Sequence, residues 1–209
     1  TRAQMGLPFG RSPAAKTLDR LLAKLDPDAL EAALRGWLAA VNKQIAQAGF
    51  SLRIAIDGKA VRGAAKRGSA CVHLLAAVCH ELRIVWGQVP VDSKTNEITQ
   101  VLPLLSLLCL EGRLVTMDAL LTQREVAQAI LDHHGDYLMV VKKNQPQLRQ
   151  DIAWCFESEP LPEEVRGTAT TLSKGHGRLE TRKIVTSAAL TGFIDWPGAA
   201  QVMQITRTV

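Results

Sequence analysis

The sequence predicts an α/β protein in which helices flank a mixed β-sheet. Two short apolar runs without polar alternation, at residues 54–56 and 114–117, are typical of buried parallel strands. A third run of this kind covers residues 138–141. Two more apolar segments, 71–78 and 82–89, are separated by a polar stretch and predict a β-hairpin. Helical segments lie between these strands, and that alternation favours layers of helix on sheet.

Two helices are expected ahead of the first strand. The first covers residues 14–24, and the second begins at Asp26, a capping residue followed by Pro27 at the first helical position. Gly49 ends the second helix. This pair is too small to hold a core of its own. We therefore expect residues 1–50 to be a helical remnant of a longer domain, and residues 51–209 to form the main domain.

The main domain is expected to alternate helices and strands and then to become β-rich. After the hairpin, the expected elements are a helix at 96–109, a strand at 113–117, a helix at 123–132, a strand at 136–142, a helix at 146–156, and strands at 167–172, 178–186 and 201–208. The order β, β-hairpin, α, β, α, β, α fits an RNase H-like core with a β-rich insertion near the C-terminus. The last expected strand runs almost to Val209, which predicts a domain truncated at its C-terminus.

Composition favours an anionic partner. The 209 residues carry a net charge of +5, and 47% of them are hydrophobic. The pI of about 9.2 makes nucleic acid the commonest candidate. The longest apolar stretch, 98–110, contains Pro103 and is too short to span a bilayer. The four cysteines lack C-x-x-C spacing and are expected to be buried, reduced thiols of a cytoplasmic protein.

Two aspartates follow buried strands and are the leading candidates for chemistry. Asp57 follows residues 54–56, and Asp118 follows residues 114–117. Sites in open α/β sheets form at the carboxyl ends of strands, so the two carboxylates would face each other if these strands are parallel neighbours. Carboxylates held close together usually bind a divalent cation. The alternative is that each aspartate caps a helix or a turn.

Cations cluster near both aspartates. Lys59 and Arg62 belong to a Gly-rich segment after Asp57, which is either a solvated approach to the hairpin or a loop that attracts phosphates. Lys142 and Lys143, followed by Asn144, end the third strand. His133 and His134 are expected to end a helix at the surface, not to bind a metal. A zinc site at Cys71 and His73 is rejected because no second ligand pair is visible.

Several short motifs, in order, resemble the DDE-type transposases of bacterial insertion sequences, in particular the H-repeat-associated kind. The matching pieces are Ala55-Ile56-Asp57-Gly58-Lys59, His73-Leu74, Lys94-Thr95-Asn96-Glu97-Ile98, Val115-Thr116-Met117-Asp118-Ala119, Asp136-Tyr137, Lys142-Lys143-Asn144-Gln145 and His176-Gly177-Arg178-Leu179-Glu180-Thr181-Arg182. The N-terminal helices resemble the end of the family's associated N-terminal domain.

The resemblance implies a metal-dependent DNA transposase. In this family three acids bind two divalent cations, Mg²⁺ or Mn²⁺, and DNA phosphodiesters are cleaved and joined. Asp57 and Asp118 match the first two acids. Glu180 follows them but lies in an expected strand, so we interpret it as part of the insertion and not as the third acid. Because of their charge, we expect Lys59, Arg62, Lys142 and Lys143 to contact DNA phosphates, and the Asn144 side chain could hydrogen-bond to DNA. The resemblance further implies a homo-oligomeric complex, and association with the nucleoid when DNA is bound.

Whether the chain is an active enzyme stays open, because the third acid is missing from the matched motifs. One alternative is a nuclease of the same fold that lacks strand transfer. Another is a DNA-binding remnant without catalysis. A small-molecule phosphotransferase is disfavoured, since the sequence has no G-x-x-x-x-G-K-[ST] loop to hold a nucleotide.

Overall fold

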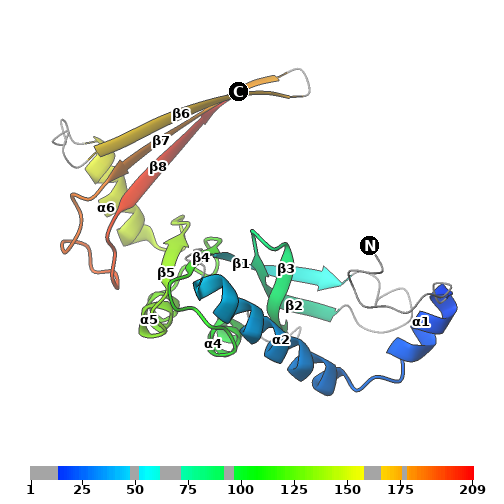
Figure 1. Ribbon diagram of the computed structural model, residues 1–209. Helices are drawn as coiled ribbons and strands as arrows, with labels where there is room; N and C mark the ends of the chain where they lie inside the picture. The colour runs from blue at the N-terminus through cyan, green and yellow to red at the C-terminus, as the bar shows by residue number, and fades with distance from the viewer. Residues whose placement is uncertain (1–13, 48–51, 62–71, 92–96, 158–165, 176–177) are drawn as a thin grey trace. The chain divides into compact units, whose positions relative to one another are not determined.

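The computed structural model describes residues 14–47, 52–61, 72–91, 97–157, 166–175 and 178–209 (Figure 1). The chain divides into two compact units, Thr1–Ala48 and Gly49–Val209. The first unit contains helices α1 (Ala15–Leu22) and α2 (Pro27–Gln47). Asp26 caps α2, because its Oδ1 accepts the backbone N–H groups of Asp28 at 2.9 Å and Ala29 at 3.4 Å. Both expected N-terminal helices are therefore present.

The second unit contains a five-stranded mixed sheet in the order β3-β2-β1-β4-β5. Its strands are β1 (Arg53–Val61), β2 (Val72–Cys79), β3 (Ile84–Val91), β4 (Leu114–Met117) and β5 (Asp136–Met139). The hairpin β2–β3 and the pair β1–β2 are antiparallel, whereas β1–β4 and β4–β5 are parallel. The predicted mixed α/β class and the predicted hairpin are confirmed.

Strand β1 is longer than the sequence suggested. The expected strand stopped at Gly58, but β1 continues to Val61 because β2 pairs with it along its whole described length, from Ile54↔Cys79 to Val61↔Val72. The parallel pairing with β4 ends earlier, at Ile56↔Met117. Asp57 therefore lies inside β1, at the point where the neighbouring strand β4 stops.

Three helices accompany this sheet. Helix α4 (Glu97–Ser106) packs against β2 and β3 and beside α5 (Arg124–Asp132), which also contacts β5. Helix α6 (Pro146–Glu157) follows β5. The largest fully buried side chains belong to β1, β2, β4, α4, α5 and the adjoining loops: Ile54, Leu75, Val101, Leu104, Leu105, Leu110, Val115, Leu121, Val126 and Ile130.

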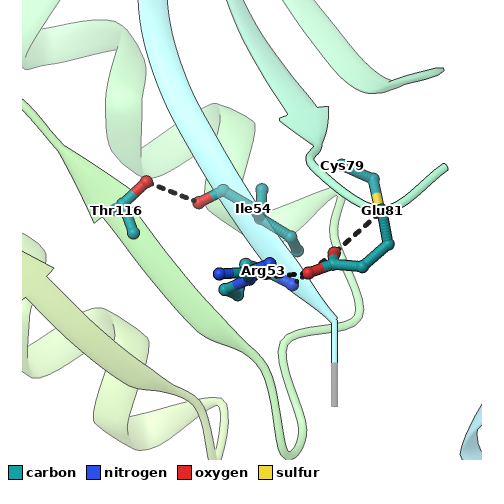
Figure 2. A network of polar contacts seen from close by, with 5 residues as sticks. All are labelled: Arg53, Ile54, Cys79, Glu81 and Thr116. Atoms are coloured by element: carbon teal, nitrogen blue, oxygen red, sulfur yellow. Dashed lines mark hydrogen bonds and ion pairs between the residues drawn. The ribbon is translucent and has the colours of Figure 1, made fainter. Parts of the chain in front are cut away.

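The start of β1 is tied to the hairpin turn by one carboxylate (Figure 2). The backbone N–H of Arg53 donates to Glu81 Oε2 at 2.9 Å, and the Arg53 side-chain Nε donates to Oε1 at 2.6 Å. The backbone N–H of Arg53 is the main reason that the pKa of Glu81 falls to about 2. Beside it, burial raises the pKa of the Cys79 thiol.

A second sheet has the order β6-β7-β8 and is antiparallel throughout. Its strands are β6 (Arg166–Gly175), β7 (Arg178–Ser187) and β8 (Val202–Thr208), close to the three strands expected there. The segment between β7 and β8 packs Trp196 against Ala127 of α5 and Leu148 of α6. Arg124 of α5 pairs with Asp195 in the same segment at 2.8 Å.

Two further expectations concern the cysteines and the membrane. Cys79 and Cys155 are buried and free, as expected, but Cys109, in the segment after α4, is exposed, and its expected burial is wrong. Cys71 lies outside the described residues. Within the described parts of the chain, no helix has the length and hydrophobicity needed to cross a membrane.

Candidate active site where β4 ends beside β1

Asp57 and Asp118 occupy equivalent positions on neighbouring parallel strands. The pairing of β1 with β4 runs from Arg53↔Leu114 to Ile56↔Met117, and an aspartate follows each member of the last pair. Ile56 and Met117 are both buried, whereas Asp57 and Asp118 are both exposed. Adjacent strands lie about 4.8 Å apart, and side chains alternate between the faces of a sheet. This register gives Asp57 and Asp118 equivalent positions on parallel neighbouring strands, the condition under which their carboxylates were expected to face each other.

Asp118 also holds the turn that follows β4. Its Oδ1 accepts the backbone N–H groups of Leu120 at 3.1 Å and Leu121 at 3.4 Å. The turn-capping alternative is therefore correct for Asp118, and it does not compete with a metal role. A carboxylate has four lone-pair sites on two oxygens, so these bonds fix its direction and leave capacity for a cation.

A basic cleft lies beside the turn that Asp118 caps. Ala119 and Leu120 form part of its wall, and the rest comes from the segment after β5 and from α6: Lys142, Lys143, Asn144 and Arg149. Three of these residues are cations, and none is an acid. The structure therefore brings the predicted Lys142 and Lys143 next to the predicted Asp118.

Arg149 was missed in the sequence analysis. It lies in the first turn of α6, where its backbone N–H donates to the Gln145 carbonyl at 2.9 Å. The sequence signal for Arg149 was Pro146, which is typical of the first position of a helix. A helix that begins at Pro146 has Arg149 in its first turn, close to the loop before it.

The side-chain amides of Asn144 and Gln145 donate to backbone carbonyls of the turn after β4. Asn144 Nδ2 donates to the Ala119 carbonyl, and Gln145 Nε2 donates to the Thr122 carbonyl at 3.0 Å. Both amides thus hold the turn after β4. This engages at least one of the two N–H donors of Asn144, whose contact with DNA stays a prediction.

Lys59 lies two residues after Asp57 on β1 and is exposed. The alternation of side chains along a strand puts Lys59 on the same face as Asp57, about 7 Å further along. This placement suits a phosphate contact beside the carboxylates. The predicted Arg62 lies outside the described residues, as do Lys94, Thr95 and Asn96.

A further carboxylate lies against the same strand. A Cβ atom added at Gly58 would fall 2.3 Å from Glu97 Oε1 and 2.6 Å from its Cδ, so the Glu97 side chain occupies the space that a larger residue would need. Gly58 neighbours Asp57, but its Cβ direction belongs to the opposite face of the sheet. A larger residue at position 58 would therefore displace the Glu97 carboxylate.

Glu180 belongs to β7 in the second sheet, where two guanidinium groups engage it. Arg207 Nη2 donates to Glu180 Oε2 at 2.5 Å, and Arg182 pairs with Oε1. The hydrogen bond from Arg207 is the main reason that the pKa of Glu180 is lowered. A carboxylate neutralised in this way is a poor ligand for a cation. In the described part of the chain, no group of three or more His, Cys, Asp and Glu side chains could hold a metal ion.

The histidine pair ends a helix as predicted. His133 is the C-cap residue of α5, and its ring Nδ1 lies 2.8 Å from the Ala129 carbonyl oxygen. His134 follows with φ of 57°, in the left-handed conformation that commonly ends helices. His73 is an exposed residue of β2, and its proposed zinc partner Cys71 lies outside the described residues.

Two adjacent carboxylates beside a basic cleft define a candidate phosphoryl-transfer site on an α/β sheet. Residues 48–203 match the family model described as "Transposase DDE domain". Because this match covers most of the chain, the protein belongs to the transposase DDE domain family, which confirms the resemblance. Membership of this family implies dependence on a divalent metal in general.

Similar proteins occur in Xanthobacter autotrophicus and Escherichia coli. The chain is 36% identical over 200 residues to the "Uncharacterized protein in dhlA 3'region" of X. autotrophicus, covering 92% of this chain and 65% of that protein. It is 33% identical over 186 residues to the "Putative transposase YncI" of E. coli O157:H7, covering 88% and 47%. It is 35% identical over 131 residues to the "H repeat-associated putative transposase YbfD" of E. coli K12, covering 62% and 52%.

The chain thus spans between about half and two thirds of the length of these relatives. Among solved structures, the cryo-EM structure of the piggyBac transposase synaptic complex with hairpin DNA is similar, with a TM-score of 0.37 and 13% identity. That alignment covers 73% of this chain and 32% of the other. A likeness at this level carries no argument about the site.

Proposed function

We propose that this chain carries the catalytic core of an insertion-sequence transposase, which cleaves DNA phosphodiesters and transfers strands with the help of a divalent cation. The observation that carries the proposal is the parallel register that leaves Asp57 and Asp118 side by side, next to the cleft of Lys142, Lys143 and Arg149. Family membership gives this geometry its chemical meaning.

The donor set fits a hard cation. Asp57 and Asp118 would hold Mg²⁺ or Mn²⁺ through carboxylate oxygens, since Mg²⁺ in particular is often bound by one or two carboxylates together with water and phosphate oxygens. When bound, such a cation activates an attacking oxygen and stabilises the leaving oxygen of a phosphodiester. Asp118 is suited to this role because two backbone N–H groups fix its direction.

The surrounding cations would bind the DNA backbone. Lys142, Lys143 and Arg149 line one cleft beside the turn that follows Asp118, and Lys59 shares a face of β1 with Asp57. Phosphate groups held there would bring a phosphodiester to the two carboxylates. We include Arg62 as a further DNA contact because of its charge and its place in the basic, Gly-rich segment after Asp57.

The wider assignments belong to the same proposal. The sheet order and the helices suit an RNase H-like core over residues 51–209, with β6, β7 and β8 as its β-rich insertion. Residues 1–50 would be the end of the family's N-terminal domain. We further propose that the protein acts in the cytoplasm, on the nucleoid, as a homo-oligomer on transposon ends and target DNA.

A second candidate function is DNA binding without catalysis. The observation that favours it is the small number of candidate metal ligands: in the described part of the chain, no group of three or more His, Cys, Asp and Glu side chains could hold a metal ion, and Glu180 is paired with two arginines. Incubation with a transposon-end duplex and Mn²⁺ separates the candidates. Nicked or joined DNA supports the transposase, nicked DNA without joining supports a nuclease, and retarded but intact DNA supports the binding protein.

Calorimetric titration with Mg²⁺ and Mn²⁺ tests the proposed ligands directly. We expect Asp57→Ala and Asp118→Ala to abolish binding, and Glu180→Ala to leave it unchanged. Loss of binding in Glu180→Ala would mean that the ligand set is wrong. Unchanged binding in all three variants would remove the chemical basis of the proposal.

A further inference from the structure

The turn after β4 is held from both ends by hydrogen bonds. At its start, Asp118 Oδ1 accepts the N–H groups of Leu120 and Leu121. At its end, Thr122 Oγ1 lies 3.0 Å from the Asp118 carbonyl oxygen and 2.9 Å from the Val140 carbonyl oxygen. Thr122 is fully buried, with 0% exposure. Its hydroxyl therefore joins this turn to the chain that leaves β5.

Two consecutive amides strengthen that junction. Asn144 reaches the Ala119 carbonyl, and Gln145 reaches the Thr122 carbonyl, so each donates across more than 20 positions of sequence to the same short turn. Gln145 Nε2 also lies 3.4 Å from Gln123 Oε1. A turn fixed in this way leaves the Asp118 carboxylate little freedom to rotate.

The same segment after β5 presents Lys142 and Lys143 to the basic cleft, whose other wall includes Ala119 and Leu120. Residues 142–145 thus contribute to two sites. The two lysines line the cleft where phosphate would bind, and the amides of the next two residues hydrogen-bond to the turn that orients Asp118. A phosphate bound at the lysines would restrict the motion of this segment, and through the amide hydrogen bonds it would also restrict the turn.

We infer that Thr122, Asn144 and Gln145 are positioning residues for Asp118, which couple phosphate binding in the basic cleft to cation binding at the carboxylates. The inference rests on the proposed function, because it assumes that Asp118 binds a divalent cation. It assigns the amides of Asn144 and Gln145 to the architecture of the site in place of contacts to DNA.

The test is the affinity of the full chain for Mn²⁺, measured by calorimetry with and without a DNA duplex of about two helical turns. The variants are Asn144→Ala and Gln145→Met, which remove one donor each, and Thr122→Val with Thr122→Ser as its conservative rescue. Gln128→Met is the matched control, because the Gln128 amide bonds only Asp132 on its own helix among the interactions described, at 2.8 Å. Asp118→Ala defines complete loss.

We expect wild-type protein to bind Mn²⁺ more tightly when the duplex is present. Asn144→Ala and Gln145→Met should each bind Mn²⁺ about 3- to 10-fold more weakly, the usual effect of losing one hydrogen bond, and should gain less from the duplex. Hydrogen exchange at Leu120 and Leu121 should accelerate in the same variants. Gln128→Met should match wild type in every measurement, and Thr122→Ser should restore what Thr122→Val loses.

A purely structural role would lower the urea midpoint and leave Mn²⁺ affinity and its response to the duplex unchanged. That result in Asn144→Ala, together with loss of binding in Asp118→Ala, would overturn the inference and leave the proposed function intact. If wild-type protein binds no Mn²⁺, or binds it no more tightly than Asp118→Ala does, the proposed metal site is overturned and the inference with it. Asn144→Ala keeps the test decisive even if Thr122→Val does not fold.

Discussion

Ile56 of β1 lies opposite Met117 of β4 in a parallel register, and each is followed directly by an aspartate. This pairing joins positions 61 residues apart along the chain and sets Asp57 beside Asp118 at the sheet edge where β4 ends. Two carboxylates held close together repel each other, and a cation between them removes that repulsion. The same arrangement therefore destabilises the metal-free protein and favours the binding of a metal.

The first prediction concerns that repulsion. Asp57→Asn keeps the size of the side chain and removes one charge, so the metal-free variant should be at least as stable as wild type. Addition of MnCl₂ should raise the Tm of wild type, because a ligand that binds only the folded state stabilises it, and should leave the Tm of Asp57→Asn unchanged. Thermal unfolding followed by circular dichroism measures both effects.

Asp132→Asn is the control for this experiment, since it removes an acid from the last turn of α5. It should respond to MnCl₂ as wild type does. An equal rise of Tm in Asp57→Asn would show that the cation binds elsewhere.

The second prediction concerns the basic cleft. Lys142→Ala and Lys143→Ala should each weaken binding to duplex DNA, and the slope of log K against log salt should become shallower by about 0.9 for each phosphate that the variant no longer neutralises. Arg149→Ala should behave in the same way, because its side chain lines the same cleft. Fluorescence anisotropy at several salt concentrations gives the slopes.

Lys16→Ala is the charge-matched control, because it removes one exposed lysine from α1. Its salt slope should equal that of wild type. If all four variants shift the slope equally, binding follows net charge alone and the cleft has no special part in it.

The local patterns of the sequence predicted much of this sheet, because buried parallel strands are short and apolar. The aspartates come where two of these apolar runs end. The apolar runs at 54–56 and 114–117 could be recognised on that basis. The length of β1 could not be predicted in this way. Its second half, which includes Lys59, depends on pairing with β2 and not on its own side chains.

The contacts around Asp118 depend on tertiary structure and were harder to foresee. Asn144 was expected to contact DNA. In the structure, the side chains of Asn144 and Gln145 donate to carbonyls of a turn more than 20 residues away. The role of Thr122 could not be predicted from the sequence, because a threonine at the start of a helix is ordinarily interpreted as a helix cap.

The third prediction is a dependence on pH. The pKa of Glu81 is about 2 in the folded protein, against 4.5 for an unperturbed glutamate. A lowered pKa means that folding favours the ionised form of Glu81. The contribution of the ionised carboxylate to stability is therefore complete above pH 4.5 and disappears as the pH falls through 2. Glu81→Gln should therefore be less stable than wild type at neutral pH, and the difference should shrink between pH 4.5 and pH 2.

Urea unfolding at a series of pH values measures this difference. Glu111→Gln, an exposed glutamate in the turn before β4, serves as the control and should show no such trend. A stability difference between Glu81→Gln and wild type that stays constant from neutral pH down to about pH 2 would contradict the contacts of the Glu81 carboxylate with Arg53 as its source.

The fourth prediction compares three glycines. A Cβ at Gly135 would fall 3.0 Å from the Leu110 carbonyl oxygen and 3.1 Å from Ile130 Cγ2, and neither the backbone nor the buried isoleucine can move freely. Gly135→Ala should therefore cost about 1–3 kcal/mol of unfolding free energy, as overpacking usually does. A Cβ at Gly58 would meet only the end of the Glu97 side chain, which can swing away, so Gly58→Ala should cost less.

Gly36→Ala provides the opposite case. Gly36 lies within α2, and an added Cβ would have no atom within 4 Å, so alanine should stabilise this helix by about 0.5–1 kcal/mol through its higher helix propensity. Urea midpoints of the three variants should rank Gly36→Ala above Gly58→Ala and Gly58→Ala above Gly135→Ala. A Gly135→Ala protein as stable as wild type would show that Leu110 and Ile130 pack less tightly around this position than the distances indicate.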